Sequence, residues 1–221
     1  MARTRDHAPS QRATIHQAAA RAHYDQDILY PLIDAAIIGT VAIVQDGQPI
    51  AIPMAIARLE DHIYLHGSRT SRLMQHLAAG HELCISLTHL DGLVVARSGM
   101  HCSANYRSAV VHGRGQVVED EVEKAQRLHD IVEALIPGSR GDFREHLPKE
   151  LKATTLIAVS LAEAACKIRT GEPNDDKDDL DLPYWAGVIP IERQYGEPIP
   201  AADLSTAVAT PAYALHYPQR A

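Results

Sequence analysis

Residues 39–68, GTVAIVQDGQPIAIPMAIARLEDHIYLHGS, carry the pattern that decides the fold. Two runs rich in β-branched residues, 39–45 and 50–58, flank Asp46-Gly47, which is a strong signal for a two-residue hairpin turn. Pro53 has no N–H to donate to a neighbouring strand, so we expect it at a sheet edge or at a bulge. This stretch therefore predicts an antiparallel hairpin as the start of a β-sheet.

The chain around this hairpin reads as further short strands with a few helices between them. Because strands and helices do not alternate regularly, a parallel doubly wound sheet is disfavoured, and we expect a mainly β fold with outer α-helices, a small antiparallel barrel. Pro31 lies inside the first helical pattern and predicts that this helix is short or begins late. Asp91-Gly92 reads as a turn. The expected elements are helices at 25–36, 71–79 and 121–135, and strands at 62–66, 83–90, 93–97, 106–118 and 155–164.

Composition sets the broad class. The chain has 221 residues, of which 46% are hydrophobic and 22% charged, the balance of an ordinary globular protein. Its formal net charge of −7 argues against a nucleic-acid partner. No apolar run is long enough to span a membrane, and the first residues lack the apolar centre of a signal peptide. Three separate cysteines suggest neither a disulfide framework nor a zinc site. We expect a cytoplasmic protein with a loosely held arm at 1–24, one domain at 25–190 and a C-terminal extension at 191–221.

The segment 63–77, IYLHGSRTSRLMQHL, is the first candidate for chemistry. A strand ends near His66, a loop follows, and a helix begins near Ser71. Unpaired N–H groups at a helix start favour phosphate, and Arg72 can hold a phosphate through two N–H groups at once. The alternative is a capped surface helix whose arginine faces water.

Two other polar segments stand out. Asn105-Tyr106-Arg107-Ser108 opens a long strand, and 166–171, CKIRTG, places Lys167 and Arg169 on one strand face. Trp185, the single tryptophan, follows an acidic loop. These residues suit a bound ring or a phosphate, but they equally suit a strand edge in water and a packed tryptophan.

Taken in order, four stretches resemble the pyridoxamine 5′-phosphate oxidase-like FMN-binding split-barrel family, most closely the branch of the nitroimidazole-resistance reductases. They are VAIVQDGQPIAIPMA (41–55), YLHGSRTSRLMQHL (64–77), NYRSAVVHGRGQVVED (105–120) and ELKATTLIAVSLAEAACKIR (150–169). The resemblance covers about residues 20–190. It implies a six-stranded antiparallel split β-barrel that forms a homodimer, with FMN at the subunit interface.

The resemblance also implies the residues that bind the cofactor. The phosphate segment matches Leu65, His66, Gly67, Ser68, Ser71 and Arg72, and the flavin ring is expected against the neighbouring hairpin at Ile52, Pro53 and Met54. By position, the second subunit contributes Tyr106, Arg107, Lys167, Arg169 and Trp185. A cation such as Arg107 or Lys167 near the flavin would raise its reduction potential. No catalytic acid or base and no metal ligand is expected.

The implied function is an FMN-dependent oxidoreductase that reduces a small organic acceptor, such as a nitro compound or a quinone, with electrons from a nicotinamide donor. Vitamin B6 oxidation is disfavoured because the C-terminal stretch is nearly free of basic residues and 172–181 is acidic. Two alternatives stay open. The 13 histidines allow a haem-binding or haem-degrading protein with His66 or His101 as axial ligand, and a flavin-binding stress protein without turnover is also compatible.

Overall fold

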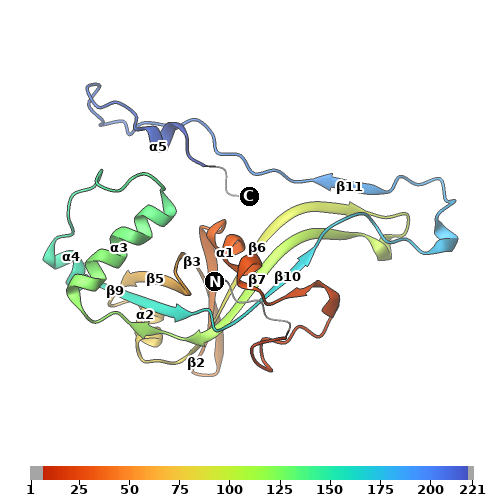
Figure 1. Ribbon diagram of the computed structural model, residues 1–221, viewed down its shortest axis with the longest axis horizontal. Helices are drawn as coiled ribbons and strands as arrows, with labels where there is room; N and C mark the ends of the chain where they lie inside the picture. Colours follow the sequence, from red (N-terminus) through yellow and green to blue (C-terminus); the bar gives the residue numbers. More distant parts are fainter. Residues whose placement is uncertain (1–6, 219–221) are drawn as a thin grey trace.

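A computed structural model describes residues 7–218, and its strands form two antiparallel sheets (Figure 1). The larger sheet has the order β1-β10-β7-β6-β2-β3, and β11 pairs with the outer part of β6. Its strands are β1 (Ala22–His23), β2 (Ile38–Gln45), β3 (Gln48–Ala55), β6 (Glu82–Val95), β7 (Ser103–Arg114), β10 (Glu163–Arg169) and β11 (Gly187–Pro190).

The smaller sheet has the order β4-β5-β9-β8, and an aliphatic core lies between it and the larger sheet. Its strands are β4 (Ala57–Leu59), β5 (His62–Ser68), β8 (Gln116–Val117) and β9 (Thr154–Ser160). The helices are α1 (Gln26–Asp34), α2 (Arg72–Ala78), α3 (Glu121–Leu135), α4 (Pro148–Ala153) and α5 (Ala212–Leu215), with single 3₁₀ turns η1 (Ala19–Arg21), η2 (Gly99–His101) and η3 (Lys177–Asp179). The predicted mainly β class with outer helices is confirmed.

The first hairpin forms as its sequence predicts. Asp46 and Gly47 both have positive φ, of 52° and 72°, as a two-residue hairpin turn requires. β3 pairs only with β2, so Pro53 lies on an edge strand where its missing N–H costs no ladder hydrogen bond. Helix α1 begins at Gln26 and continues through Pro31 to Asp34, so it is shorter than the predicted 25–36, as one of the two expectations had it, but it does not begin late.

The expected turn at Asp91-Gly92 is also wrong. β6 is one strand from Glu82 to Val95, with a register irregularity between Leu90 and Gly92. A glycine is required at position 92 because the paired strand β11 lies very close to it. A β-carbon on Gly92 would lie 2.9 Å from the Ile189 carbonyl oxygen. Two positions that favour a turn therefore form a bulge inside a long strand.

Two other expected strands each divide between the two sheets. The pattern at 106–118 becomes β7 and β8, separated at Gly115, where a β-carbon would lie 2.8 Å from the Leu77 carbonyl oxygen. The pattern at 155–164 becomes β9, which pairs with β5, and β10, which pairs with β7. The chain thus passes from one sheet to the other at each of these points.

Outside the barrel, β6 and β7 continue side by side as a long arm with β11 along it, and the C-terminal segment returns above the body toward α3 (Figure 1). That return is fixed where the Tyr217 hydroxyl donates to the Leu135 carbonyl at 2.5 Å. The described part of the N-terminal arm is fastened as well, since Arg12 forms ion pairs with Glu82 and Glu163. Within residues 7–218, no helix combines the length and apolarity that crossing a membrane demands.

Candidate functional site

The turn between β5 and α2 offers hydrogen-bond donors that the described chain leaves open. The Ser71 N–H donates to the Ser68 carbonyl at 2.9 Å, and the Ser68 and Thr70 hydroxyls lie 2.9 Å apart. Ser71 occupies the N-cap of α2 with an extended backbone, yet its side chain accepts no capping hydrogen bond. Arg72 is exposed and has no ion pair with a described residue. The groups of this turn that an anion could engage are therefore the uncapped N–H groups of the first turn of α2, the Ser71 hydroxyl and the exposed Arg72 guanidinium.

The residues of the β2–β3 hairpin that were predicted to contact the flavin lie close to this turn at Gly67. A β-carbon on Gly67 would lie 3.0 Å from Met74 Cγ and 3.9 Å from Met54 Cε, so the glycine lets β5, α2 and β3 approach one another. Pro53 is exposed on the edge strand, and Ile52 is partly buried against the core. The structure therefore brings Met54 and the phosphate segment together.

Leu65 differs from its neighbours in the predicted site. Its side chain is fully buried in the core. His66, next to it, is half-buried, and no hydrogen bond to its ring is formed by another described residue. Leu65 can therefore contact a ligand only through its backbone, whereas the His66 imidazole is available.

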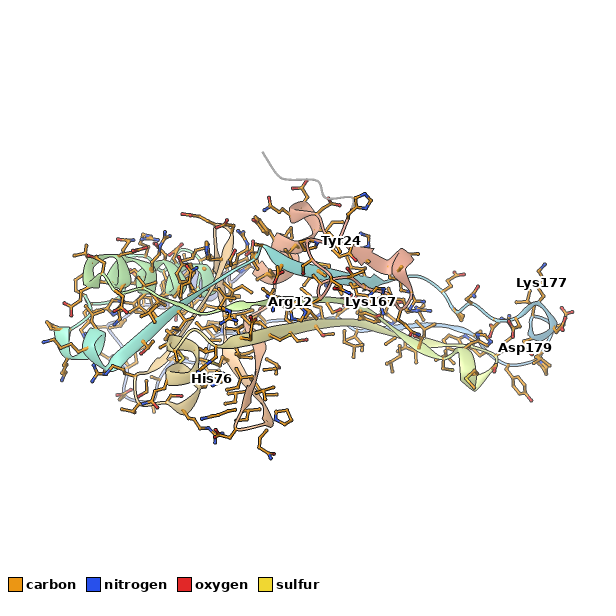
Figure 2. The ribbon with its side chains drawn as sticks, turned by 90° about the horizontal axis from the view of Figure 1, so that it is seen from below. Arg12, Tyr24, His76, Lys167, Lys177 and Asp179 are labelled. Carbon is orange, nitrogen blue, oxygen red and sulfur yellow. The ribbon has the colours of Figure 1, made fainter. Side chains whose placement is uncertain are left out.

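The five residues expected from a second subunit do not form one group within a single chain. Tyr106 and Arg107 are adjacent in β7 and so face opposite sides of the sheet, and Arg169 lies opposite Tyr106 in the register. Lys167 lies midway along the sheet in Figure 2 and forms no ion pair with a described residue. Trp185 is 63% exposed, and its ring lies beside Gly187 at the start of β11, a strand that Figure 1 shows far from α2.

The two arginines of this group already have partners. Arg107 donates to both carboxylate oxygens of Asp91, at 3.0 and 2.9 Å. Arg169 is buried and donates to the Asn105 side chain and to the Gly171 and Glu172 carbonyls. Arg169 thus fastens the turn that follows β10.

The histidines are spread over the fold. Burial lowers the pKa of His66, which favours the neutral imidazole that binds metals. His101 lies on the arm, with its Nε2 3.3 Å from an Asp176 oxygen. Among the described residues, no three histidine, cysteine or acidic side chains gather in a way that could hold a metal ion.

A groove runs along β6 beneath the returning C-terminal segment, and the sequence analysis did not predict it. Two cavities, of about 740 and 480 Å³, share Thr88, His89 and Arg193 in their walls. His89 is 5% exposed, and its Nε2 lies 3.0 Å from the Leu32 carbonyl oxygen. Burial lowers the pKa of His89, and this effect outweighs the Leu32 hydrogen bond, which raises it, so the site favours the neutral ring. The sequence signal that could have indicated this groove is His89, a histidine at a position of β6 whose side chain points into the fold.

Comparison with known proteins bears directly on the site, because residues 25–168 match the family described as Pyridoxamine 5′-phosphate oxidase. The chain belongs to this family. Its matched region includes β2, β3, the β5–α2 turn and most of β10. A search of curated proteins gives no match.

Two solved structures resemble this pyridoxamine 5′-phosphate oxidase family member over nearly its whole length. The flavocytochrome Anf3 from Azotobacter vinelandii is 38% identical, with a TM-score of 0.90, covering 94% of this chain and 97% of that one. The FAD and heme binding protein from Mycobacterium smegmatis is 34% identical, with a TM-score of 0.84, covering 87% and 95%. A putative 5-nitroimidazole antibiotic resistance protein from Bacteroides thetaiotaomicron, 20% identical with a TM-score of 0.56 over 66% and 86%, shares the fold. The predicted antiparallel split-barrel fold is confirmed, but the described residues form sheets of seven and four strands where six strands were predicted.

Proposed function

We propose that this protein binds a flavin nucleotide at the β5–α2 turn and acts as an oxidoreductase. The observation that carries the proposal is the open donor set at this turn, in a chain 38% identical to a flavocytochrome over 94% of its length. A flavin phosphate fits these donors because Ser68, Ser71 and Arg72 supply hydrogen bonds and positive charge at one exposed place. Met54 and the edge at Pro53 lie beside it, where the flavin ring would pack.

The flavin, when bound, supplies the electron or hydride transfer. The chain's own residues bind and orient it and set the charge around it. Of the two cations expected near the ring, Arg107 is neutralised by Asp91, whereas Lys167 has no such partner among the described residues. Lys167 is therefore the better candidate to raise the flavin potential, for reduction of a small acceptor with electrons from a nicotinamide donor.

FMN is the flavin that the sequence resemblance implies, and FAD is the alternative that the Mycobacterium smegmatis structure raises by its name. The donor set at the turn suits the phosphate that both cofactors carry. The mass of the flavin released by denaturation distinguishes them: FMN is expected, and FAD would correct the cofactor while leaving the phosphate site in place.

A haem is the second candidate, because the two solved structures at 38% and 34% identity are named for a haem or a cytochrome as well as a flavin. His66 fits an axial ligand better than His101: its ring has no described hydrogen bond and burial keeps it neutral, whereas His101 lies beside Asp176. His66→Ala should remove the Soret band and His101→Ala should retain it. Loss of the Soret band in His101→Ala, with retention in His66→Ala, would instead place the haem on the arm at His101.

We also propose that the protein works as a homodimer with the cofactor between two copies. Exposed apolar side chains line the arm: Leu90, Leu93, Trp185, Ile189 and Ile191. Such a patch is typical of an interface. In a dimer, the partner's arm would supply residues that lie far from the β5–α2 turn within one chain. Sedimentation should give twice the chain mass, and a flavin-loaded monomer would contradict the interface site.

With three free cysteines, we place the protein in the reducing cytoplasm.

The direct test of the flavin proposal is the absorption spectrum of the purified protein with and without Arg72. We expect two flavin bands in the natural protein and a large loss of bound flavin in Arg72→Ala. Equal flavin content in both would exclude the turn as the phosphate site.

A further inference from the structure

One edge of β6 has a gap between its two partner strands. On the other edge β6 pairs with β7 along nearly its whole length. On this edge β2 pairs with β6 only as far as Ser86, and β11 begins its pairing at Gly92. Residues 87–90 therefore have no neighbouring strand here among the described residues, and they line the two cavities of the groove.

His89 is the buried polar side chain of this gap. It is 5% exposed and lines both cavities. Its Nε2 lies 3.0 Å from the Leu32 carbonyl oxygen. Because a carbonyl oxygen can only accept, Nε2 carries the proton, and in the neutral ring the lone pair is left on Nδ1. The Leu32 carbonyl thus fixes both the orientation and the tautomer of the imidazole.

The Nδ1 atom of His89 is an acceptor without a partner in the described chain. No hydrogen bond joins it to a described residue. The Tyr195 hydroxyl above it is a buried atom without a partner and is closed to water, whereas His89 Nδ1 is not among such atoms. Since His89 lies in the wall of both cavities, Nδ1 is open to them. A buried ring of fixed tautomer therefore offers one acceptor to the groove.

Two classes of ligand fit this acceptor poorly. A carboxylate can only accept, so it would meet Nδ1 lone pair against lone pair. An ammonium group would meet the charge of Arg193, a wall residue close enough to lower the pKa of His89. A neutral hydroxyl suits both neighbours, because its hydrogen donates to Nδ1 and its oxygen accepts.

The smaller cavity, of about 480 Å³, has room for more than a hydroxyl. Ala36, Ile37 and Leu87 contribute to its wall beside Thr40 and Thr88. Neither Leu90 nor Ile191, which the proposed dimer would cover, lines this cavity. An apolar ring that carries one hydroxyl matches a wall of mixed apolar and hydroxyl groups around a single fixed acceptor.

We propose that this cavity binds a neutral hydroxyarene, whose O–H donates to His89 Nδ1 and whose ring lies against the apolar wall. The site goes beyond the proposed flavin function, because it shares no residue with the β5–α2 turn. Hydroquinones belong to this class, and they are what quinone reduction yields; that connection alone rests on the proposed function.

The test is titration calorimetry of the purified protein with 2-naphthol and with 2-methoxynaphthalene, which has the same rings but no O–H. We expect 2-naphthol to bind about three- to tenfold more tightly. His89→Gln keeps a donor for the Leu32 carbonyl but has no acceptor at the position of Nδ1, so the two ligands should bind it about equally. His112→Gln, which changes a histidine outside both cavities, is the matched control and should keep the preference.

A second variant does not depend on how His89→Gln folds. Thr88 is exposed and lines both cavities, so Thr88→Trp fills space without altering the core and should weaken binding of both ligands. The proposal is overturned if 2-naphthol does not bind, if the natural protein binds both ligands equally, or if the preference persists in His89→Gln at an unchanged melting temperature. Flavin content, measured in the same samples, reports separately on the β5–α2 turn.

Discussion

Arg107 grips Asp91 through two hydrogen bonds, from Nε at 3.0 Å and from Nη2 at 2.9 Å. The pair joins β7 to the bulge of β6 and holds Asp91-Gly92 inside a continuous strand. Asp91 thereby neutralises the charge of Arg107, a residue that its position in the strand alone would assign to cofactor binding. In that group, Lys167 and Arg169 form no ion pair with a described residue, and Arg169 is held by hydrogen bonds to neutral acceptors.

Replacing Lys167 by Met should therefore lower the flavin midpoint potential, by about 20–60 mV for the loss of about 1–3 kcal/mol of charge interaction with the reduced flavin. Arg107→Met is the matched comparison and should shift the potential less, because Asp91 already offsets its charge. Redox titration of both variants measures the difference. A larger shift for Arg107→Met would reverse their roles.

Arg72→Ala should weaken flavin binding by about 1.5–3 kcal/mol, the range for a hydrogen bond to a charged group. Fluorescence titration of the flavin-free protein gives the dissociation constant. Lys124→Ala removes a partly exposed cation from α3 and should leave the affinity unchanged. Equal affinities for Arg72→Ala and the natural protein would count against the phosphate site.

Arg169→Met should destabilise the fold by about 2–4 kcal/mol, because it leaves the buried Asn105 Oδ1 without its donor, although the Gly171 carbonyl still accepts from Asn105 Nδ2 at 3.0 Å. Thermal unfolding should show a melting temperature several degrees lower. Arg140→Met, which removes an exposed arginine, is the control. If the folded variant retains its flavin, Arg169 stabilises the turn after β10 and does not bind the cofactor. Loss of flavin at an unchanged melting temperature would instead show that Arg169 contacts the flavin directly.

Stability should fall as the pH drops below about 6.5, the ordinary histidine value. Burial lowers the pKa of His66, His76, His89 and His146 in the folded chain. Between the folded and unfolded pKa values, the unfolded chain binds protons that the folded chain does not, so acid favours unfolding. His89→Gln keeps a donor for the Leu32 carbonyl and should reduce the proton uptake on unfolding by up to one. Denaturant unfolding from pH 5.5 to 8.5 measures this, and an unchanged slope would contradict it.

Local signals predicted the parts of the fold that local chemistry determines. Asp46-Gly47 formed its turn, and Asp120 caps α3 through the Val122 and Glu123 N–H groups. The failures involve contacts between distant segments. Asp91-Gly92 became a bulge because Arg107 and β11 meet it there, and neither partner is near it in sequence.

The candidate site likewise has one part that local sequence predicts and one part that depends on contacts between distant segments. The β5–α2 turn is contiguous in sequence, and its open donors could be predicted from 66–72. The groove was missed because His89 and Tyr195 come together only when the C-terminal segment folds back over β6. Likewise, the burial of Leu65 and the pairing of Arg169 with Asn105 depend on neighbouring strands that periodicity alone does not identify.

The most direct measurement for the central claim is the absorption spectrum of the purified protein, with mass analysis of the small molecules released on denaturation. We expect a flavin nucleotide in amounts approaching one per chain, lost in Arg72→Ala and retained in Lys124→Ala. A purified protein that contains no flavin and binds none when FMN or FAD is added would contradict it.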